Sequence, residues 1–281
     1  MNRARRIAFV DYELENFHAN TYLQILRKEL KNRGFIVSGC TAIKENTGRA
    51  WAKKNNVTYY ACPRDLDRNA DCYAILAPSN PETHMELCCR VFPFHKTTYV
   101  DKTFAPDEAT ARKIFALADR YRVSVQTSSA LRYTNVQAHV AQVGRKNVRH
   151  MVAWGSGSSF GEYAIHPIEL VISCMGAEAK DLMCRNDGSL SQIIVNFSRS
   201  RTAVINVYAG NDVPFAASVT TAKETKIMTV DDGHLFVDAA AGILDFLKAG
   251  KPRVARAESL MIMRMIDAAK SKAALRKFVK L

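Results

Sequence analysis

The first half of the chain alternates short apolar runs with helical segments, and this alternation limits the possible folds more than any other feature. The apolar runs, typical of buried strands, cover residues 7–10, 35–40, 71–77, 98–100 and 123–126, with 57–60 as a further candidate. Helical spacing covers residues 17–32, 48–56, 81–91 and 106–121. Strands that alternate with helices of this length predict βαβ units and a parallel sheet with right-handed crossovers.

The pattern changes after about residue 130. Strand-like runs cover residues 148–154, 192–197, 202–208, 216–221 and 226–230, and helical patterns cover 160–175, 235–248 and 258–272. Strands in succession indicate an antiparallel sheet flanked by helices. We therefore predict an α/β chain with two domains. Residues 1–128 form a Rossmann-type nucleotide-binding domain, and residues 129–281 form an α+β domain with a mostly antiparallel open sheet.

Composition narrows the class of protein. The chain has 281 residues, of which 48% are hydrophobic and 24% charged, as in ordinary globular proteins. No apolar run approaches the ~18 residues that a membrane span needs, and the basic start lacks the long apolar stretch of a signal peptide. The seven cysteines fit neither a disulfide framework nor a zinc site. We expect a cytoplasmic protein without a metal site.

The net charge of +13 raises the question of a nucleic-acid partner. The basic residues are scattered along the chain, without a dense run or an aromatic-interleaved patch. Nucleic-acid binding is therefore the alternative that we rank last. The excess charge also suits an anionic cofactor or substrate.

The loop after the first predicted strand departs from the usual dinucleotide motif. That motif is G-x-G-x-x-G, whose glycines let the backbone approach a pyrophosphate. Residues 10–18 contain no glycine and three carboxylates, Asp11, Glu13 and Glu15, which would repel a pyrophosphate. His18 and Asn20 either supply hydrogen-bond donors or lie on the helix surface, and we favour the surface.

The end of the second predicted strand bears on the choice of cofactor. An acid near this point usually holds the adenosine ribose, and none is present at residues 40–41. Thr41, Lys44 and Arg49 are candidates to receive a 2′-phosphate, which favours NADP over NAD. A plain surface turn explains these three residues at least as well.

An ordered set of short motifs resembles the Gfo/Idh/MocA oxidoreductase family, which includes glucose–fructose oxidoreductase and inositol dehydrogenase. The family has a proline-to-histidine turn after its fourth strand and Glu-Lys-Pro after its fifth. This chain has Pro78 to His84 in the first place and Asp101-Lys102-Thr103 in the second. The ending at residues 246–252 and the helix after it also look like the family's.

The second domain extends the resemblance. The family carries Asp-x-Gly-x-His-x-x-Asp on a helix, where this chain has Glu162, Ala164, His166 and Glu169. Residues four apart share a helix face, so Glu162 would lie beside His166. A histidine beside a carboxylate suits general acid/base chemistry. A solvated polar helix face is the alternative, and the matching Asp101-Lys102 element favours the acid/base interpretation.

The resemblance implies roles for these residues. Lys102 and His166 would take part in hydride-transfer chemistry on a hydroxyl group, with Glu162 tuning the histidine or holding the substrate. Asp101 would hold the nicotinamide-side ribose or orient Lys102. The remaining cofactor-binding candidates, together with Asp101 and Lys102, are Asp11, Tyr12, Thr41, Pro78, Ser79, Asn80 and His84. The cofactor would be NAD or NADP, the substrate a sugar, cyclitol or related polyol, and the protein a homo-oligomer through its C-terminal sheet.

Two further alternatives stay open beside nucleic-acid binding. A degenerate family member without redox activity would be a small-molecule binding or regulatory protein, as the missing glycines indicate. A lyase or hydrolase with a tightly held cofactor would also keep the fold. Taken alone, Asp101-Lys102 is better explained as a surface ion pair at a strand end, and only the flanking motifs favour a functional role.

Overall fold

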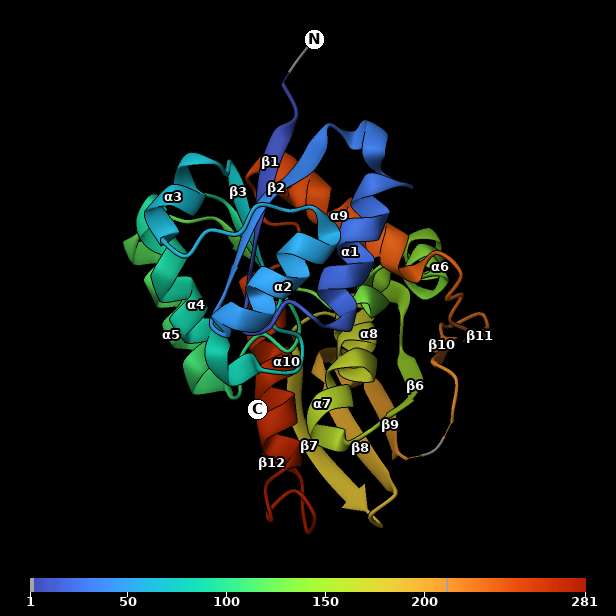
Figure 1. Ribbon diagram of the computed structural model, residues 1–281. Helices are drawn as coiled ribbons and strands as arrows, with labels where there is room; N and C mark the ends of the chain where they lie inside the picture. The colour runs from blue at the N-terminus through green and yellow to red at the C-terminus, as the bar shows by residue number, and fades with distance from the viewer. Residues whose placement is uncertain (1–2, 211) are drawn as a thin grey trace. The chain divides into compact units, whose positions relative to one another are not determined.

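The computed structural model describes residues 3–210 and 212–281, which form two compact units (Figure 1). The first unit contains the chain up to Ser128 together with Phe236–Val254, and the second contains Ser129–Leu235 and Ala255–Leu281. The sequence places the whole of 129–281 in the second domain, and the segment 236–254 corrects this division. Residues 236–254 belong to the first unit because they include an apolar helix that packs on the first sheet.

The first unit contains a five-stranded parallel sheet. Its strands are β1 (Arg5–Asp11), β2 (Phe35–Ala42), β3 (Cys72–Ile75), β4 (Thr98–Val100) and β5 (Val125–Gln126), in the order β2-β1-β3-β4-β5. Every adjacent pair is parallel, so the predicted Rossmann-type sheet is confirmed. The candidate strand at 57–60 is reduced to an isolated parallel bridge between Cys40 and Tyr59.

The helices between these strands are α1 (Phe17–Arg27), α2 (Glu45–Asn55), α3 (Pro63–Arg68), α4 (His84–Val91) and α5 (Glu108–Arg120). Helix α1 is shorter than the predicted 17–32, because a separate 3₁₀ turn at Lys31–Arg33 precedes Gly34. Gly34 has a left-handed φ of 76°, a conformation that glycine adopts without strain. Helix α3 begins at Pro63, in a segment that the sequence analysis leaves without a helix.

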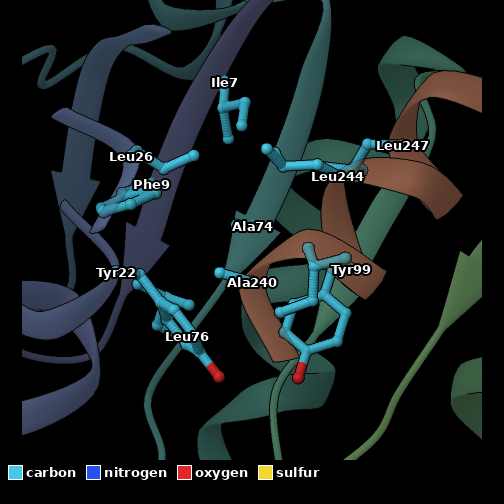
Figure 2. Close-up of a pocket in the computed structure, with 11 residues that line it drawn as sticks. Ile7, Phe9, Tyr22, Leu26, Ala74, Leu76, Tyr99, Ala240, Leu244 and Leu247 are labelled. Carbon is cyan, nitrogen blue, oxygen red and sulfur yellow. The ribbon is translucent and has the colours of Figure 1, made fainter. Parts of the chain in front are cut away.

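Helix α9 (Leu235–Ala249) joins the core of the first unit although it lies near the end of the chain. Figure 1 shows it beside α1, and Figure 2 shows Ala240, Leu244 and Leu247 around the apolar pocket that Ile7 of β1 also lines. The apolar pocket among these side chains has a volume of about 20 Å³, roughly enough for one water molecule. Because it is so small and entirely apolar, this pocket belongs to the packing of the core and is no ligand site.

The second unit contains a seven-stranded sheet. Its strands are β6 (His150–Gly157), β7 (Ala179–Asn186), β8 (Leu190–Phe197), β9 (Thr202–Ala209), β10 (Ala216–Thr220), β11 (Thr225–Thr229) and β12 (Val279–Lys280), in the order β11-β10-β6-β9-β8-β7-β12. Among the described strands of this second sheet, only the β6–β9 pair is parallel. The predicted mostly antiparallel sheet is confirmed. Strand β7 lies in a polar stretch without strong alternation, which is why the sequence analysis omits it.

Among the described residues, the α-helices of the second unit are α6 (Asn135–Val143), α7 (Phe160–Tyr163), α8 (Ile165–Met175) and α10 (Arg256–Ala269). Helix α8 contacts β6, β9 and α10, and α10 also contacts β7. The predicted helix 160–175 is divided at Ala164, which links α7 to α8. Across residues 3–210 and 212–281, no helix combines the length and apolar character that a membrane crossing requires.

Candidate functional site

The carboxyl ends of β1 and β3 border a small cavity in the first unit. The strand order reverses between these two strands, and open α/β sheets bind ligands at such a point. The cavity has a volume of about 70 Å³ and is lined by Asp11, Glu13, Glu15, Asn16, Ala77, Pro78, Ser79 and Asn80. It therefore brings together four of the predicted cofactor-binding residues, Asp11, Pro78, Ser79 and Asn80. Tyr12 is not part of the lining; its ring packs under the Lys44 ammonium, 4.9 Å from the ring centroid.

Asp11 is fully buried at the end of β1 and accepts hydrogen bonds from its own loop. Its carboxylate accepts from Asn16 Nδ2 at 2.9 Å and from the Glu13 backbone N–H at 3.2 Å. Burial raises the pKa of Asp11 to about 7, although these hydrogen bonds act in the opposite direction. The loop thus supplies an internal acid at the position where the glycine-rich motif would present free backbone N–H groups to a ligand.

The two outer carboxylates of the loop each have a lysine partner. Lys44 Nζ lies 2.7 Å from Glu13 Oε2, and Lys54 Nζ lies 3.2 Å from Glu15 Oε1. These pairs compensate two of the three negative charges that the sequence places here, so the repulsion of an anion is smaller than the sequence suggests. Both pairs are exposed, and such pairs contribute at most about 1 kcal/mol to stability.

The start of α1 is capped by a side chain of the protein. Asn16 Oδ1 accepts a hydrogen bond from the Ala19 N–H at 2.9 Å, as N-cap residues do. A glycine-rich turn would leave this helix end open to phosphate and let the backbone approach it. The side chains of Asn16 and Asp11 accept backbone N–H groups that a glycine-rich loop would offer to phosphate, and the loop has no glycine. A dinucleotide pyrophosphate therefore does not fit this loop in the manner of a glycine-rich cradle.

The residues proposed to receive a 2′-phosphate have other partners. Lys44 holds Glu13, and Arg49 Nε donates to Glu45 Oε1 at 2.9 Å. Thr41 is buried within β2, where it pairs with Val10 of β1. The sequence-based preference for NADP rested on these three residues and receives no support from their contacts.

Asp101 and Lys102 follow β4 directly, and both are buried. Asp101 Oδ1 accepts from the Lys102 backbone N–H at 2.8 Å and from the Tyr99 hydroxyl at 3.3 Å. Among the residues that the structure describes, no side chain pairs with the Lys102 ammonium. The simple interpretation of Asp101-Lys102 as an exposed ion pair is therefore wrong, because neither residue is exposed and the carboxylate binds the lysine backbone.

His18 is the functional candidate that sequence reasoning misses. It is buried in α1, and its Nδ1 bonds to Asp101 Oδ2. The expectation of a helix-surface residue is wrong for His18. A usable signal was present: His18, Tyr22 and Leu26 recur every four residues, and all three lie on the buried face of α1.

His84 does not face the cavity, contrary to its predicted place in the cofactor pocket. Its side chain is fully buried, with Nδ1 3.0 Å from the Phe104 carbonyl oxygen and Nε2 3.2 Å from that of Ala77. Burial lowers the pKa of His84. The imidazole connects the loop after β3 to the loop after β4 and so acts as a brace for both.

In the second unit, His166 lies in the first turn of α8 between two aromatic rings. The ring centroids of Tyr163 and Phe215 are each 5.7 Å from that of His166. His166 Nδ1 lies 3.0 Å from Ser129 Oγ. Glu162, the predicted companion of His166, accepts from Ser158 Oγ at 2.8 Å.

Glu169 belongs to a buried network of charges in the second unit. Its carboxylate accepts from Arg132 Nε and from the Ser129 N–H, each at 2.6 Å. Arg132 also donates to Glu258 at 2.7 Å, and Glu258 accepts from Arg145 at 2.6 Å. This network fixes Ser129, the hydrogen-bond partner of His166. The network has no local signature in the sequence, because its paired residues are 37 to 126 positions apart.

Comparison with known proteins supports the same fold over the whole chain. No family model and no curated protein matches the sequence. Among solved structures, GenD2 from gentamicin A biosynthesis, in complex with NAD, aligns with a TM-score of 0.83 and 11% identity, covering 100% of this chain and 97% of that one. Myo-inositol 2-dehydrogenase from Lactobacillus plantarum has a TM-score of 0.81 and 14% identity, covering 99% and 100%.

A third match carries both cofactor and substrate. Myo-inositol dehydrogenase from Lactobacillus casei, in complex with NAD(H) and myo-inositol, aligns with a TM-score of 0.82 and 10% identity, covering 99% of this chain and 97% of that one. These neighbours are dehydrogenases of the Gfo/Idh/MocA type, so the chain has the fold of that family from end to end. The resemblance inferred from the ordered motifs is confirmed as a resemblance of fold.

Proposed function

We propose that this chain is an oxidoreductase that acts on a hydroxyl group of a small polyhydroxylated molecule, such as a sugar or cyclitol. Proteins with this fold include an inositol dehydrogenase bound to NAD(H) and myo-inositol and a biosynthetic protein bound to NAD. By analogy, the first unit would hold the nicotinamide cofactor. Lys102 would contact the substrate, and His166 and Glu162 would take the acid–base roles that the resemblance implies.

The observation that carries the proposal is the state of Lys102. Its side chain is buried at the carboxyl end of a parallel strand, the edge at which α/β sheets place ligands. Among the described residues no carboxylate pairs with Lys102, and its Nζ is not one of the fully buried nitrogens that lack a partner. The ammonium therefore keeps contact with solvent at the end of a largely buried side chain, where a ligand oxygen could bind it.

The first experiment measures binding of NAD, NADH, NADP and NADPH to the purified protein by calorimetry. We expect one oxidised and reduced pair to bind with micromolar affinity. A screen of cyclitols and aldoses with that pair then identifies a substrate by nicotinamide absorbance. In Lys102→Ala, turnover should fall by about 10²–10⁴-fold, the usual effect of losing a proton-handling group.

Lys113→Ala is the matched control, since Lys113 is exposed on α5. This variant should bind and turn over like the unmodified protein. If none of the four nucleotides binds, the protein is not a nicotinamide-dependent dehydrogenase. Binding with unchanged turnover in Lys102→Ala would instead remove Lys102 from the reaction.

A second candidate function follows from the loop after β1. A small-molecule binding or regulatory protein that has lost the cofactor would retain the fold while filling the pyrophosphate position with its own side chains. The internal hydrogen bonds of Asp11 and the Asn16 cap favour this alternative. A polyol that binds in the absence of every nicotinamide nucleotide, without net turnover, would select it.

The second sheet offers a surface for a homo-oligomer. Val152, Val204, Ile194 and Met183 are neighbours in register across β6, β9, β8 and β7, and each is only partly buried. Their alternate neighbours, such as Ile193 and Ile205, are fully buried. An apolar row across four strands favours self-association. Sedimentation velocity should therefore show a dimer or larger species that Ile194→Arg reduces to the monomer.

A further inference from the structure

His18 and Asp101 make a buried contact between two segments far apart in the sequence. His18 comes from the first turn of α1 and Asp101 from the end of β4, 83 residues later. The imidazole and the carboxylate are both buried, and the bond joins Nδ1 to Oδ2. A carboxylate at one imidazole nitrogen fixes the tautomer and orients the ring, as in Ser-His-Asp hydrolases.

The surroundings hold the carboxylate firmly. Asp101 Oδ1 accepts from the Lys102 N–H and the Tyr99 hydroxyl, and the same hydroxyl lies 2.7 Å from the Ser128 carbonyl oxygen. Figure 2 shows the hydroxyls of Tyr22 and Tyr99 pointing away from the apolar pocket. The His18 ring and the Lys102 N–H each occupy one Asp101 oxygen, while the single Tyr99 O–H proton lies closer to the Ser128 carbonyl oxygen. This reduces the capacity of Asp101 for ribose hydroxyls, the first of its two predicted roles.

Aromatic rings surround the imidazole on several sides. The ring centroids of Tyr22 and Phe236 are each 5.6 Å from that of His18, and the ring of Phe17 is 5.9 Å away. Phe17 is 62% exposed, so this wall of the site reaches solvent. Within residues 3–210 and 212–281, no hydrogen-bond partner is found for His18 Nε2.

We infer that His18 and Asp101 form an acid–base site of this chain, in which His18 Nε2 accepts the proton of a hydroxyl group on a small-molecule ligand. The Nδ1–H donates to Asp101, so the neutral ring carries its lone pair on Nε2. On proton transfer the ligand oxygen keeps the O–H electron pair, and the imidazolium is stabilised by the Asp101 carboxylate. The ligand is an alcohol or polyol whose apolar face packs against Phe17.

This inference extends beyond the proposed function, because the site uses only side chains of the first unit and needs no nicotinamide cofactor. It also gives a role to a residue that lies outside the motifs shared with the Gfo/Idh/MocA family. A contact that merely fixes α1 to the sheet would not require a defined tautomer or an accessible Nε2.

Acylation by diethyl pyrocarbonate tests whether Nε2 is available. The reagent attacks unprotonated imidazole nitrogens, and mass spectrometry resolves each histidine in one sample at neutral pH. We expect His18 to react at least about tenfold faster than His84, which is fully buried between two carbonyl oxygens. His95, which is exposed, serves as the reactive reference.

Asp101→Asn separates an acid–base site from a structural contact. An amide at this position retains the shape but favours the wrong imidazole tautomer, so His18 acylation should slow by about tenfold or more while His95 is unaffected. If His18 in the unmodified protein reacts no faster than His84, or if Asp101→Asn leaves its rate unchanged, the proposal fails.

A second measurement uses only the unmodified protein, so it does not require any variant to fold. Nitrogen NMR of the unmodified protein with ¹⁵N-labelled histidine reports the tautomer of each ring. We expect His18 to be protonated at Nδ1 and unprotonated at Nε2 in its neutral form. A neutral His18 protonated at Nε2 would overturn the inference whether or not nicotinamide nucleotides bind.

Discussion

Asn16 donates a hydrogen bond from Nδ2 to Asp11 Oδ2 at 2.9 Å, while its Oδ1 caps α1 through the Ala19 N–H. One side chain therefore organises both the buried acid and the start of the first helix. The same Nδ2 lies 2.7 Å from the Glu13 carbonyl oxygen. The loop after β1 is held by hydrogen bonds among its own residues. Single substitutions in this loop can therefore measure what these hydrogen bonds contribute to stability.

Removal of Asn16 should destabilise the protein through two separable effects. Asn16→Ala loses the cap, worth about 0.5–2 kcal/mol, and removes the side-chain donor to Asp11 Oδ2, worth about 1 kcal/mol. Asn16→Ser keeps a capping oxygen and loses only the amide donor, so it should cost less. Urea denaturation measures both, and equal losses in the two variants would contradict this division.

Asp11 should make stability depend on pH. Its carboxyl has a pKa of about 7 in the folded protein, against an ordinary value of 3.8. Between these values the folded state binds more protons than the unfolded state, so the contribution of Asp11 to the free energy of unfolding falls as pH rises. From pH 5 to 7 this loss is about 2–3 kcal/mol.

Asp11→Asn removes the titrating group and should flatten that part of the profile. Denaturation at pH 5 and pH 7 for the variant and the unmodified protein gives the difference directly. Glu29→Gln, at an exposed position of the same unit, is the control and should leave the profile unchanged. An Asp11→Asn profile parallel to that of the unmodified protein would show that Asp11 is already ionised at pH 5.

The charged network of the second unit should be costly to break. Glu169→Ala leaves Arg132 buried with one carboxylate partner in place of two and removes the acceptor of the Ser129 N–H. Removing one partner of a buried ion pair lowers the free energy of unfolding by about 3–5 kcal/mol. Calorimetric melting should show a fall of roughly 10 °C. Arg68→Ala, which breaks an exposed pair with Asp65, should change the melting temperature little.

Gly157 should not tolerate a side chain. A Cβ at this position would lie 2.0 Å from Cγ of Tyr163, whose ring packs on His166. Gly157→Ala must displace that ring and should cost about 1–3 kcal/mol. Gly161→Ala, in the neighbouring helix α7, meets no atom within 4 Å and should be neutral or stabilising by up to about 1 kcal/mol. Similar melting temperatures for the two variants would contradict the close packing of Tyr163.

The sequence predicts most of the secondary structure, because the signals are local. Alternating apolar runs and helix patterns identify β1, β2, β3 and β4 and the helices between them except α3, and the successive strands after residue 130 indicate the antiparallel sheet. The ordered motifs around Lys102 and His166 predict the fold family for the same reason. Each motif depends on residue types at short, fixed separations.

The candidate site was only partly predictable. Asp11, Ser79 and Asn80 line one cavity as expected, since they follow neighbouring parallel strands. His84 was misplaced because a histidine in a turn sequence has the same appearance whether it faces a ligand or braces two loops. The pairing of Lys44 with Glu13 and of Arg49 with Glu45 likewise depends on side-chain placement that composition does not encode.

The sequence by itself determines the two classes of sheet, their order along the chain and the lack of a glycine-rich turn after β1. Only the tertiary structure decides that α9 packs in the first unit and that His18 meets Asp101. Helix propensity and apolar spacing give a helix one buried face but do not specify which sheet covers it. A hydrogen bond across 83 residues exists only once β4 and α1 are brought together by the burial of their apolar neighbours.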